Sequence, residues 1–240
     1  MKLEIASANS NHLRDGTKRE CSKLKQMLYQ AKDDDVGSYL LETAGLATGD
    51  VDRAIADFDE AIRRNPQDDH AFNQRGLTWS FNGDNDRAIA DYSEAIRLNP
   101  QLGSAFNNRA IAWSEKGEND RAIADFDEAI RLNPQDADLF YLRAGEWSTK
   151  GENDRAIADY SEAIRLNPND EVAFTLRGSI WSNKGDSDRA IADFDEAIRL
   201  NPQYAVAFIF RGLAWSHKGN DEQAIADLDE ARRLMGDPIP

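Results

Sequence analysis

The chain has 240 residues, of which 30% are charged, and its formal net charge at pH 7 is −15. Binding to nucleic acid or to an anionic membrane surface requires clustered lysine and arginine, so this balance argues against both. The sequence contains no run of about 18 apolar residues and no apolar leader, and Cys21 is its only cysteine. We therefore expect a cytoplasmic protein without an intrachain disulfide.

The N-terminal segment, residues 1–34, differs in composition from the rest of the chain. Thr17-Lys18-Arg19-Glu20 fits a capping box, the pattern that starts a helix with reciprocal side-chain bonds. One apolar face follows it, made of Cys21, Leu24, Met27 and Leu28. We predict an amphipathic helix at about 18–32 that caps the repeats after it, whereas residues 1–16 show no clear periodicity.

From residue 35 onward the sequence repeats. The string DRAIADYSEAIRLNP occupies 86–100 and 154–168, and DRAIADFDEAIRLNP occupies 120–134 and 188–202. Looser copies stand at 52–66 and 222–236. The period is therefore 34 residues, which is typical of stacked helical hairpins that bury a core only between neighbours.

Each repeat predicts two helices joined by a turn. In the second helix of one copy, Ala88, Ile89, Tyr92 and Ala95 fall on one face. Gly83 and its counterparts mark the turn before this helix, and an Asn-Pro pair ends it. We expect N-terminal carboxylates to cap the second helices, at Asp86, Asp120, Asp154 and Asp188. We expect Asp91 and Glu94, near Arg97, to lie on a solvated face with local ion pairs.

The repeats share further positions when each is numbered so that its proline falls at position 32. Position 4 is phenylalanine (Phe72, Phe106, Phe140, Phe174, Phe208), position 8 is Gly or Ala, and position 11 is tryptophan (Trp79, Trp113, Trp147, Trp181, Trp215). Positions 20 and 27 are alanine, and position 24 is Phe, Tyr or Leu. This pattern closely resembles the tetratricopeptide repeat (TPR) family over residues 35–236, as six repeats. The first is degenerate, because Ser38 and Gly45 replace its aromatic residues, and Arg replaces the family's leucine at position 7.

The resemblance implies an all-α fold, a right-handed α-solenoid of 34-residue helix-turn-helix repeats. It also implies a non-catalytic protein that binds a partner in a concave groove lined by the first helix of each repeat. At the C-terminal end, Arg232 and Gly236 replace the Ile and Pro of the other repeats, and residues 237–240 form a short tail. One interpretation is a polar end to the array; the alternatives are an exposed apolar face and a shortened chain.

Chemical signatures are missing from the sequence. It has no P-loop, no GxSxG, no HExxH and no dinucleotide-binding turn. His12, His70 and His217 are far apart in the sequence, so we expect no metal site, no cofactor and no enzyme activity. The arginines at position 7 suggest either an anion site or, as the preferred interpretation, stems that lie on the core and pair with nearby carboxylates.

The first helices vary between repeats while the second helices hardly change. We therefore expect a protein or peptide partner on the first helices, and drift on a solvated face is the alternative explanation of the variation. The predicted partner-binding residues are Asn73, Leu77, Ser80, Phe81, Asn107, Asn108, Ile111, Ser114, Tyr141, Ser148, Thr175 and Ile209. Two functions remain open: an adaptor that holds a partner segment, or a homo-oligomer that assembles through its ends or grooves.

Overall fold

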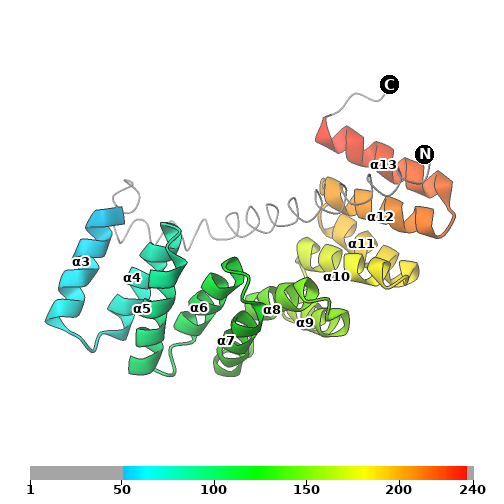
Figure 1. Ribbon diagram of the computed structural model, residues 1–240. Helices are drawn as coiled ribbons and strands as arrows, with labels where there is room; N and C mark the ends of the chain where they lie inside the picture. Colours follow the sequence, from blue (N-terminus) through cyan, green and yellow to red (C-terminus); the bar gives the residue numbers. More distant parts are fainter. Residues whose placement is uncertain (1–50, 237–240) are drawn as a thin grey trace, which may run out of the picture. The chain divides into compact units, whose positions relative to one another are not determined.

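The computed structural model describes residues 51–236, and all regular structure within them is helical (Figure 1). The chain divides into two parts after Glu60, and helix α3 (Val51–Arg64) crosses that boundary. The capping helix predicted at 18–32, the first helix of repeat 1 and the tail at 237–240 lie outside the described residues. Helix α3 is the second helix of repeat 1.

Repeats 2 to 6 are five helical hairpins, each made of a first helix and a second helix. In chain order they are α4 (Asp69–Phe81) with α5 (Asn85–Leu98), α6 (Gly103–Glu115) with α7 (Asn119–Leu132), α8 (Ala137–Thr149) with α9 (Asn153–Leu166), α10 (Glu171–Asn183) with α11 (Ser187–Leu200), and α12 (Ala205–His217) with α13 (Asp221–Met235).

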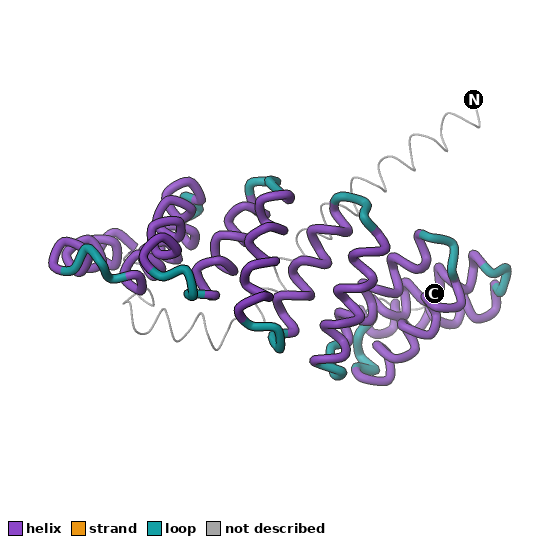
Figure 2. Tube along the Cα trace, turned by 90° about the horizontal axis from the view of Figure 1, so that it is seen from below, coloured by secondary structure: helices purple, strands orange, loops and turns teal. Residues whose placement is uncertain are grey.

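The hairpins stack in sequence order. The two helices of each hairpin pack against each other, and each second helix also packs on the first helix of the next hairpin. Figure 2 shows α4 to α13 as a row of adjacent helical pairs joined by short loops. The all-α fold of consecutive helix-turn-helix repeats is therefore confirmed.

The turn inside each hairpin depends on a glycine. Gly83 has φ 79° and Gly117 has φ 76°, in the left-handed region that glycine enters without steric cost. The Gly83 amide donates to the Ser80 carbonyl oxygen at 2.9 Å, and the Asp84 amide donates to the Trp79 carbonyl oxygen at 2.9 Å. These bonds satisfy backbone groups at the end of the first helix and reverse the chain for the second.

The predicted cap of the second helices was wrong by two residues. Asp84 is the N-cap of α5 and accepts a hydrogen bond from the Arg87 amide, so Asp86 lies inside the first turn. Asp86 instead pairs with Lys116 of the next repeat. The same cross-repeat pair recurs as Lys150–Asp120, Lys184–Asp154 and Lys218–Asp188. These carboxylates therefore connect neighbouring repeats.

The core lies between the two helices of a repeat and the helix that follows. Phe126 on α7 is 1% exposed and belongs to one cluster with Phe106 of its own repeat and Leu139 of the next. The aromatic ring at position 24 requires a small residue at position 8 of the first helix. In repeat 5, for example, a Cβ on Gly178 would lie 2.7 Å from Cε1 of Phe194. The tryptophans are only half-buried, and Arg87 stacks over Trp79 with its guanidinium carbon 4.5 Å from the ring centre.

We expect Phe126→Ala to lower the free energy of unfolding by about 3–5 kcal/mol, because it leaves a cavity where one ring touches two repeats. Urea denaturation followed by circular dichroism measures the loss. Phe81→Ala is the matched control, since Phe81 is 65% exposed and its removal opens no cavity. Equal losses for the two variants would contradict this description of the core.

Candidate partner-binding surface

All twelve predicted partner-binding residues lie on first helices. They are Asn73, Leu77, Ser80 and Phe81 on α4, Asn107, Asn108, Ile111 and Ser114 on α6, Tyr141 and Ser148 on α8, Thr175 on α10, and Ile209 on α12. Phe81 is exposed, Asn73 and Thr175 are buried, and the other nine are half-buried. We call the solvent-facing side of α4, α6 and α8 the first-helix surface.

Asn73 and Thr175 lie below this surface. Asn73 is 5% exposed, and its Oδ1 accepts a hydrogen bond of 3.1 Å from Nδ2 of Asn108 in the next repeat. Thr175 is 2% exposed, and its hydroxyl donates to the Glu171 carbonyl oxygen at 2.8 Å. Asn73 therefore contributes to the junction between repeats 2 and 3, and Thr175 to its own helix.

The predicted serines are partly occupied by contacts within the protein. The Ser114 hydroxyl donates at 2.6 Å to Glu146, which is 7% exposed and also accepts from Nδ2 of Asn119 at 2.9 Å. Sequence reasoning missed Glu146. It is the only acidic residue at position 10 of a first helix in repeats 2 to 6, and that irregularity was the available signal.

Tyr141 combines a packed ring with a polar end. Its ring meets Tyr160 edge-on, with the ring centres 5.7 Å apart and an angle of 72° between the planes. Burial raises the pKa of the Tyr141 phenol well above its usual range, and the negative charge of Asp170 adds to this effect. The hydroxyl therefore keeps its proton at neutral pH, so that it can act as a donor.

Two side chains of the first helices are only partly used by contacts among residues 51–236. The Phe81 side chain at the end of α4 is 65% exposed. On α6, the Oδ1 atom of Asn107 is buried and finds no hydrogen-bond donor among residues 51–236. A buried acceptor without a donor carries a desolvation cost of about 1–3 kcal/mol, which a donor from a bound molecule would relieve.

The arginines at position 7 are held by carboxylates, as the preferred interpretation predicted. Nε and Nη2 of Arg109 bind the two carboxylate oxygens of Asp125, both at 2.7 Å. The same two-bond pair recurs as Arg75–Asp91, Arg143–Asp159, Arg177–Asp193 and Arg211–Asp227. Asp91 is 6% exposed, so its expected place on a solvated face was wrong, whereas the expected surface ion pair of Glu94 with Arg97 is present at 2.6 Å.

A third partner of these arginines comes from the preceding repeat. Nη1 of Arg109 donates to the Ser93 hydroxyl at 3.0 Å, whereas Nη1 of Arg211 donates to Asp195 at 2.6 Å. The hydrogen bond from Arg211 to Asp227 is the largest cause that raises the pKa of Arg211 above its usual value, and Asp195 adds to it. An anion would therefore have to displace a carboxylate to reach either arginine.

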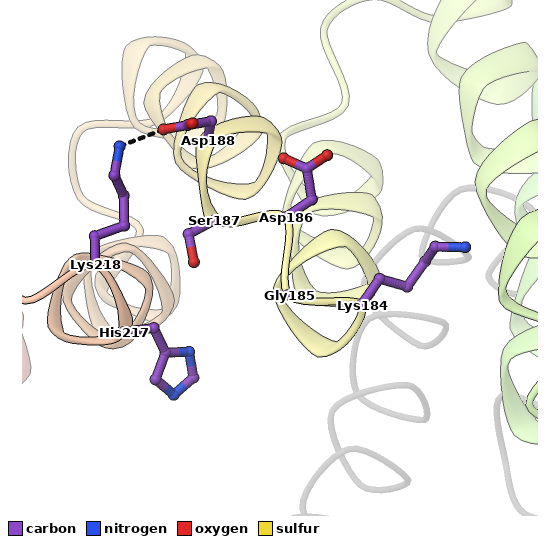
Figure 3. Close-up of a pocket in the computed structure, with 7 residues that line it drawn as sticks. All are labelled: Lys184, Gly185, Asp186, Ser187, Asp188, His217 and Lys218. Atoms are coloured by element: carbon purple, nitrogen blue, oxygen red, sulfur yellow. Dashed lines mark hydrogen bonds and ion pairs between the residues drawn. The ribbon is translucent and has the colours of Figure 1, made fainter.

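Shallow pockets lie at the hairpin turns, and charged residues that line them pair with one another. Figure 3 shows one of about 410 Å³, lined by Lys184, Gly185, Asp186, Ser187, Asp188, His217 and Lys218. Asp188 pairs with Lys218, and Asp186 accepts from the Arg189 amide as the cap of α11. Among residues 51–236 no group of three His, Cys, Asp or Glu side chains has the geometry of a metal site.

The family model described as "Tetratricopeptide repeat" matches residues 43–103, 80–137, 108–171 and 182–238, more than half of the chain. The chain belongs to the tetratricopeptide repeat family. Repeats of this kind are typically non-catalytic modules of protein–protein interaction, so an interaction scaffold is the class of function that the family supports.

Solved structures with similar folds are tetratricopeptide repeat proteins too. YrrB, described as "a TPR protein with an unusual peptide-binding site", is 27% identical, with a TM-score of 0.66 over 75% of this chain and 93% of its own. MamA is 23% identical, with a TM-score of 0.65 over 67% and 94%. A repeat protein from Parabacteroides merdae is 20% identical, with a TM-score of 0.68 over 85% and 80%. No curated protein matches the sequence significantly.

Within residues 51–236, every helix is too short or too polar to cross a bilayer.

We expect Arg109→Met to lower the free energy of unfolding by about 3 kcal/mol, because it leaves the buried Asp125 carboxylate without its cation. The double variant Arg109→Met/Asp125→Leu should recover most of this loss, since it removes both charges. Thermal and urea unfolding of the single and double variants measure the difference. A double variant as unstable as the single one would show that the arginine acts through packing alone.

Proposed function

We propose that this tetratricopeptide repeat protein is a non-catalytic adaptor that holds an extended segment of a partner protein on the first-helix surface of repeats 2 to 4. The observation that carries the proposal is the unpaired Oδ1 of Asn107, one repeat away from the exposed ring of Phe81. The Phe81 ring is already accessible, and the Asn107 oxygen would become accessible if its half-buried side chain turned outward, where a donor from the partner could pair with it.

The chemistry of this surface favours an uncharged partner segment that offers both backbone hydrogen bonds and apolar side chains. The Asn107 oxygen would accept a backbone N–H, the Tyr141 hydroxyl is a protonated donor at neutral pH, and Phe81 would cover an apolar side chain. The arginines next to this surface are already bound to carboxylates. A terminal carboxylate or a phosphate would therefore meet no available guanidinium of this set.

The comparison with YrrB supports the proposal, because that protein's description states that it has a peptide-binding site and it is 27% identical to this chain. Asn73 has a supporting role here, since it is 5% exposed and accepts from Asn108. It would fix the orientation of the Asn108 amide from below rather than touch the partner. The predicted residues that are half-buried on α4, α6 and α8, around Asn107 and Tyr141, would line the path of the segment, whereas Thr175 on α10 and Ile209 on α12 lie outside repeats 2 to 4.

The test begins with capture of binding proteins by the full-length chain from its native host, followed by titration of each purified candidate. The double variant Phe81→Ser/Asn107→Ala should weaken binding by about 2 kcal/mol or more, roughly thirtyfold in Kd, if these side chains are hot spots. The melting temperature should hardly change, because Phe81 is exposed and Asn107 loses an unpaired atom.

Ala124→Gln is the matched control for this experiment. Ala124 is exposed on the second helix α7, and glutamine is a good helix former. This variant should bind the partner as the wild type does. Unchanged binding by the double variant, or a comparable loss in the control, would place the interface away from the first-helix surface.

A further inference from the structure

Exposed apolar side chains gather in the last repeat. Within residues 51–236 five large hydrophobic side chains are exposed, and four of them are on α12 and α13. Ile225 is 60% exposed, Met235 57%, Leu213 46% and Leu228 39%. Figure 1 shows α13 as the last drawn helix of the row, packed beside α12.

The same positions are buried in the preceding repeat. Ile191 and Phe194 on α11 correspond to Ile225 and Leu228, and they are 6% and 0% exposed. They are covered by Phe210, Ala214 and Trp215 of the next repeat. The outer face of α13 therefore has the form of a surface that a helix covers elsewhere in the same chain.

Another repeat of the same kind is a poor match for this face. Ile96, which corresponds to Arg232, packs across a repeat junction against the cluster that contains Phe106. A further repeat stacked on α13 would place that phenylalanine against the Arg232 guanidinium. Nη1 of Arg232 lies 3.6 Å from Oδ1 of Asp229, an ion pair that is longer than a hydrogen bond. A covering surface that brings a carboxylate to Arg232 would therefore pair with it more closely.

The exposed residues of α13 form one stripe. Asp221, Ile225, Leu228, Arg232 and Met235 follow one another at spacings of four, three, four and three residues, and all are exposed. This alternation keeps residues on one side of a helix and is the spacing of a seam between two packed helices. We call these five residues the α13 seam.

The α13 seam is complementary to itself. The midpoint of Ile225 and Leu228 along the helix is also the midpoint of Asp221 and Arg232. When two copies of α13 run antiparallel about that point, Ile225 of each copy faces Leu228 of the other. In the same register, Asp221 of each copy faces Arg232 of the other. One register thus satisfies the apolar and the charged residues together, as an isologous interface requires.

We propose that the α13 seam is the contact surface of a homodimer, in which two α13 helices pack antiparallel about a twofold axis. The contact would bury Ile225 and Leu228 in both copies and form two equivalent Asp221–Arg232 ion pairs. Leu213 and Met235 would lie at its edge. The proposal is independent of the partner segment on α4, α6 and α8, because the two surfaces share no residue.

Sedimentation velocity of the full chain over a hundredfold concentration range, at physiological salt, tests for the dimer. We expect a monomer that becomes a dimer as concentration rises, without larger species, because a twofold contact closes on itself. Ile225→Ser should shift the equilibrium to the monomer.

Charge reversal tests the register. Asp221→Arg and Arg232→Asp should each weaken the dimer about tenfold or more, because each places like charges opposite one another at two equivalent points. The double variant Asp221→Arg/Arg232→Asp should restore most of the affinity. Gln223→Arg is the matched control: it is exposed on the same turn, but about 200° around the helix from Ile225, and should leave the dimer unchanged.

Melting temperatures of all variants check that each one is folded. This check is needed because a positive charge at the start of α13 interacts unfavourably with the helix dipole and destabilises the helix. A chain that stays monomeric throughout would overturn the proposal, and so would a dimer that tolerates Ile225→Ser. A double charge variant that fails to recover would overturn the antiparallel register.

Discussion

A single hairpin of this protein cannot bury its own apolar residues, and the rest of the structure follows from that constraint. Tyr92 and Phe126 on the second helices are each 1% exposed. They reach that burial through contacts with their own first helix and with the following repeat. The second helices therefore serve two contacts at once, which explains physically why their sequences hardly differ between repeats, while the first helices keep a free side that can vary.

Electrostatics reinforces the same stacking. Each position 7 arginine from Arg75 to Arg211 binds a carboxylate of its own repeat through two hydrogen bonds, and several reach back to the preceding repeat with a third. Lysine–aspartate pairs join the turns of successive repeats. Four of these five arginines have a side-chain exposure of 20% or less, and each pairs with an aspartate of the same protein.

The last repeat shows what the stacking constraint does where no later described helix continues the row. Leu228 occupies the position of Phe194, yet it is 39% exposed whereas Phe194 is fully covered. Arg232 places a positive charge in the apolar stripe of α13, where the other repeats have isoleucine. Asp221 places a negative charge in the same stripe at the other end of the helix. The proposed partner surface on the first helices and the α13 seam are therefore distinct, because they share no residue.

The sequence by itself determined the all-α fold, the succession of helical hairpins and the pairing of the position 7 arginines with carboxylates, because a 34-residue period repeats each local signal several times. It did not identify which carboxylates pair with them, because those aspartates look like part of a solvated helix face. The site depended on tertiary structure. Asn73 and Asn107 occupy the same position in adjacent repeats, and no local pattern distinguishes them. Only the packing of one repeat on the next supplies Asn73 with the Asn108 amide and leaves the Asn107 oxygen without a donor in the part of the chain that the structure describes. Likewise, Asp86 resembles a helix cap in sequence, but the stacked neighbour brings Lys116 to it, because contacts between repeats depend on how two helices approach in space.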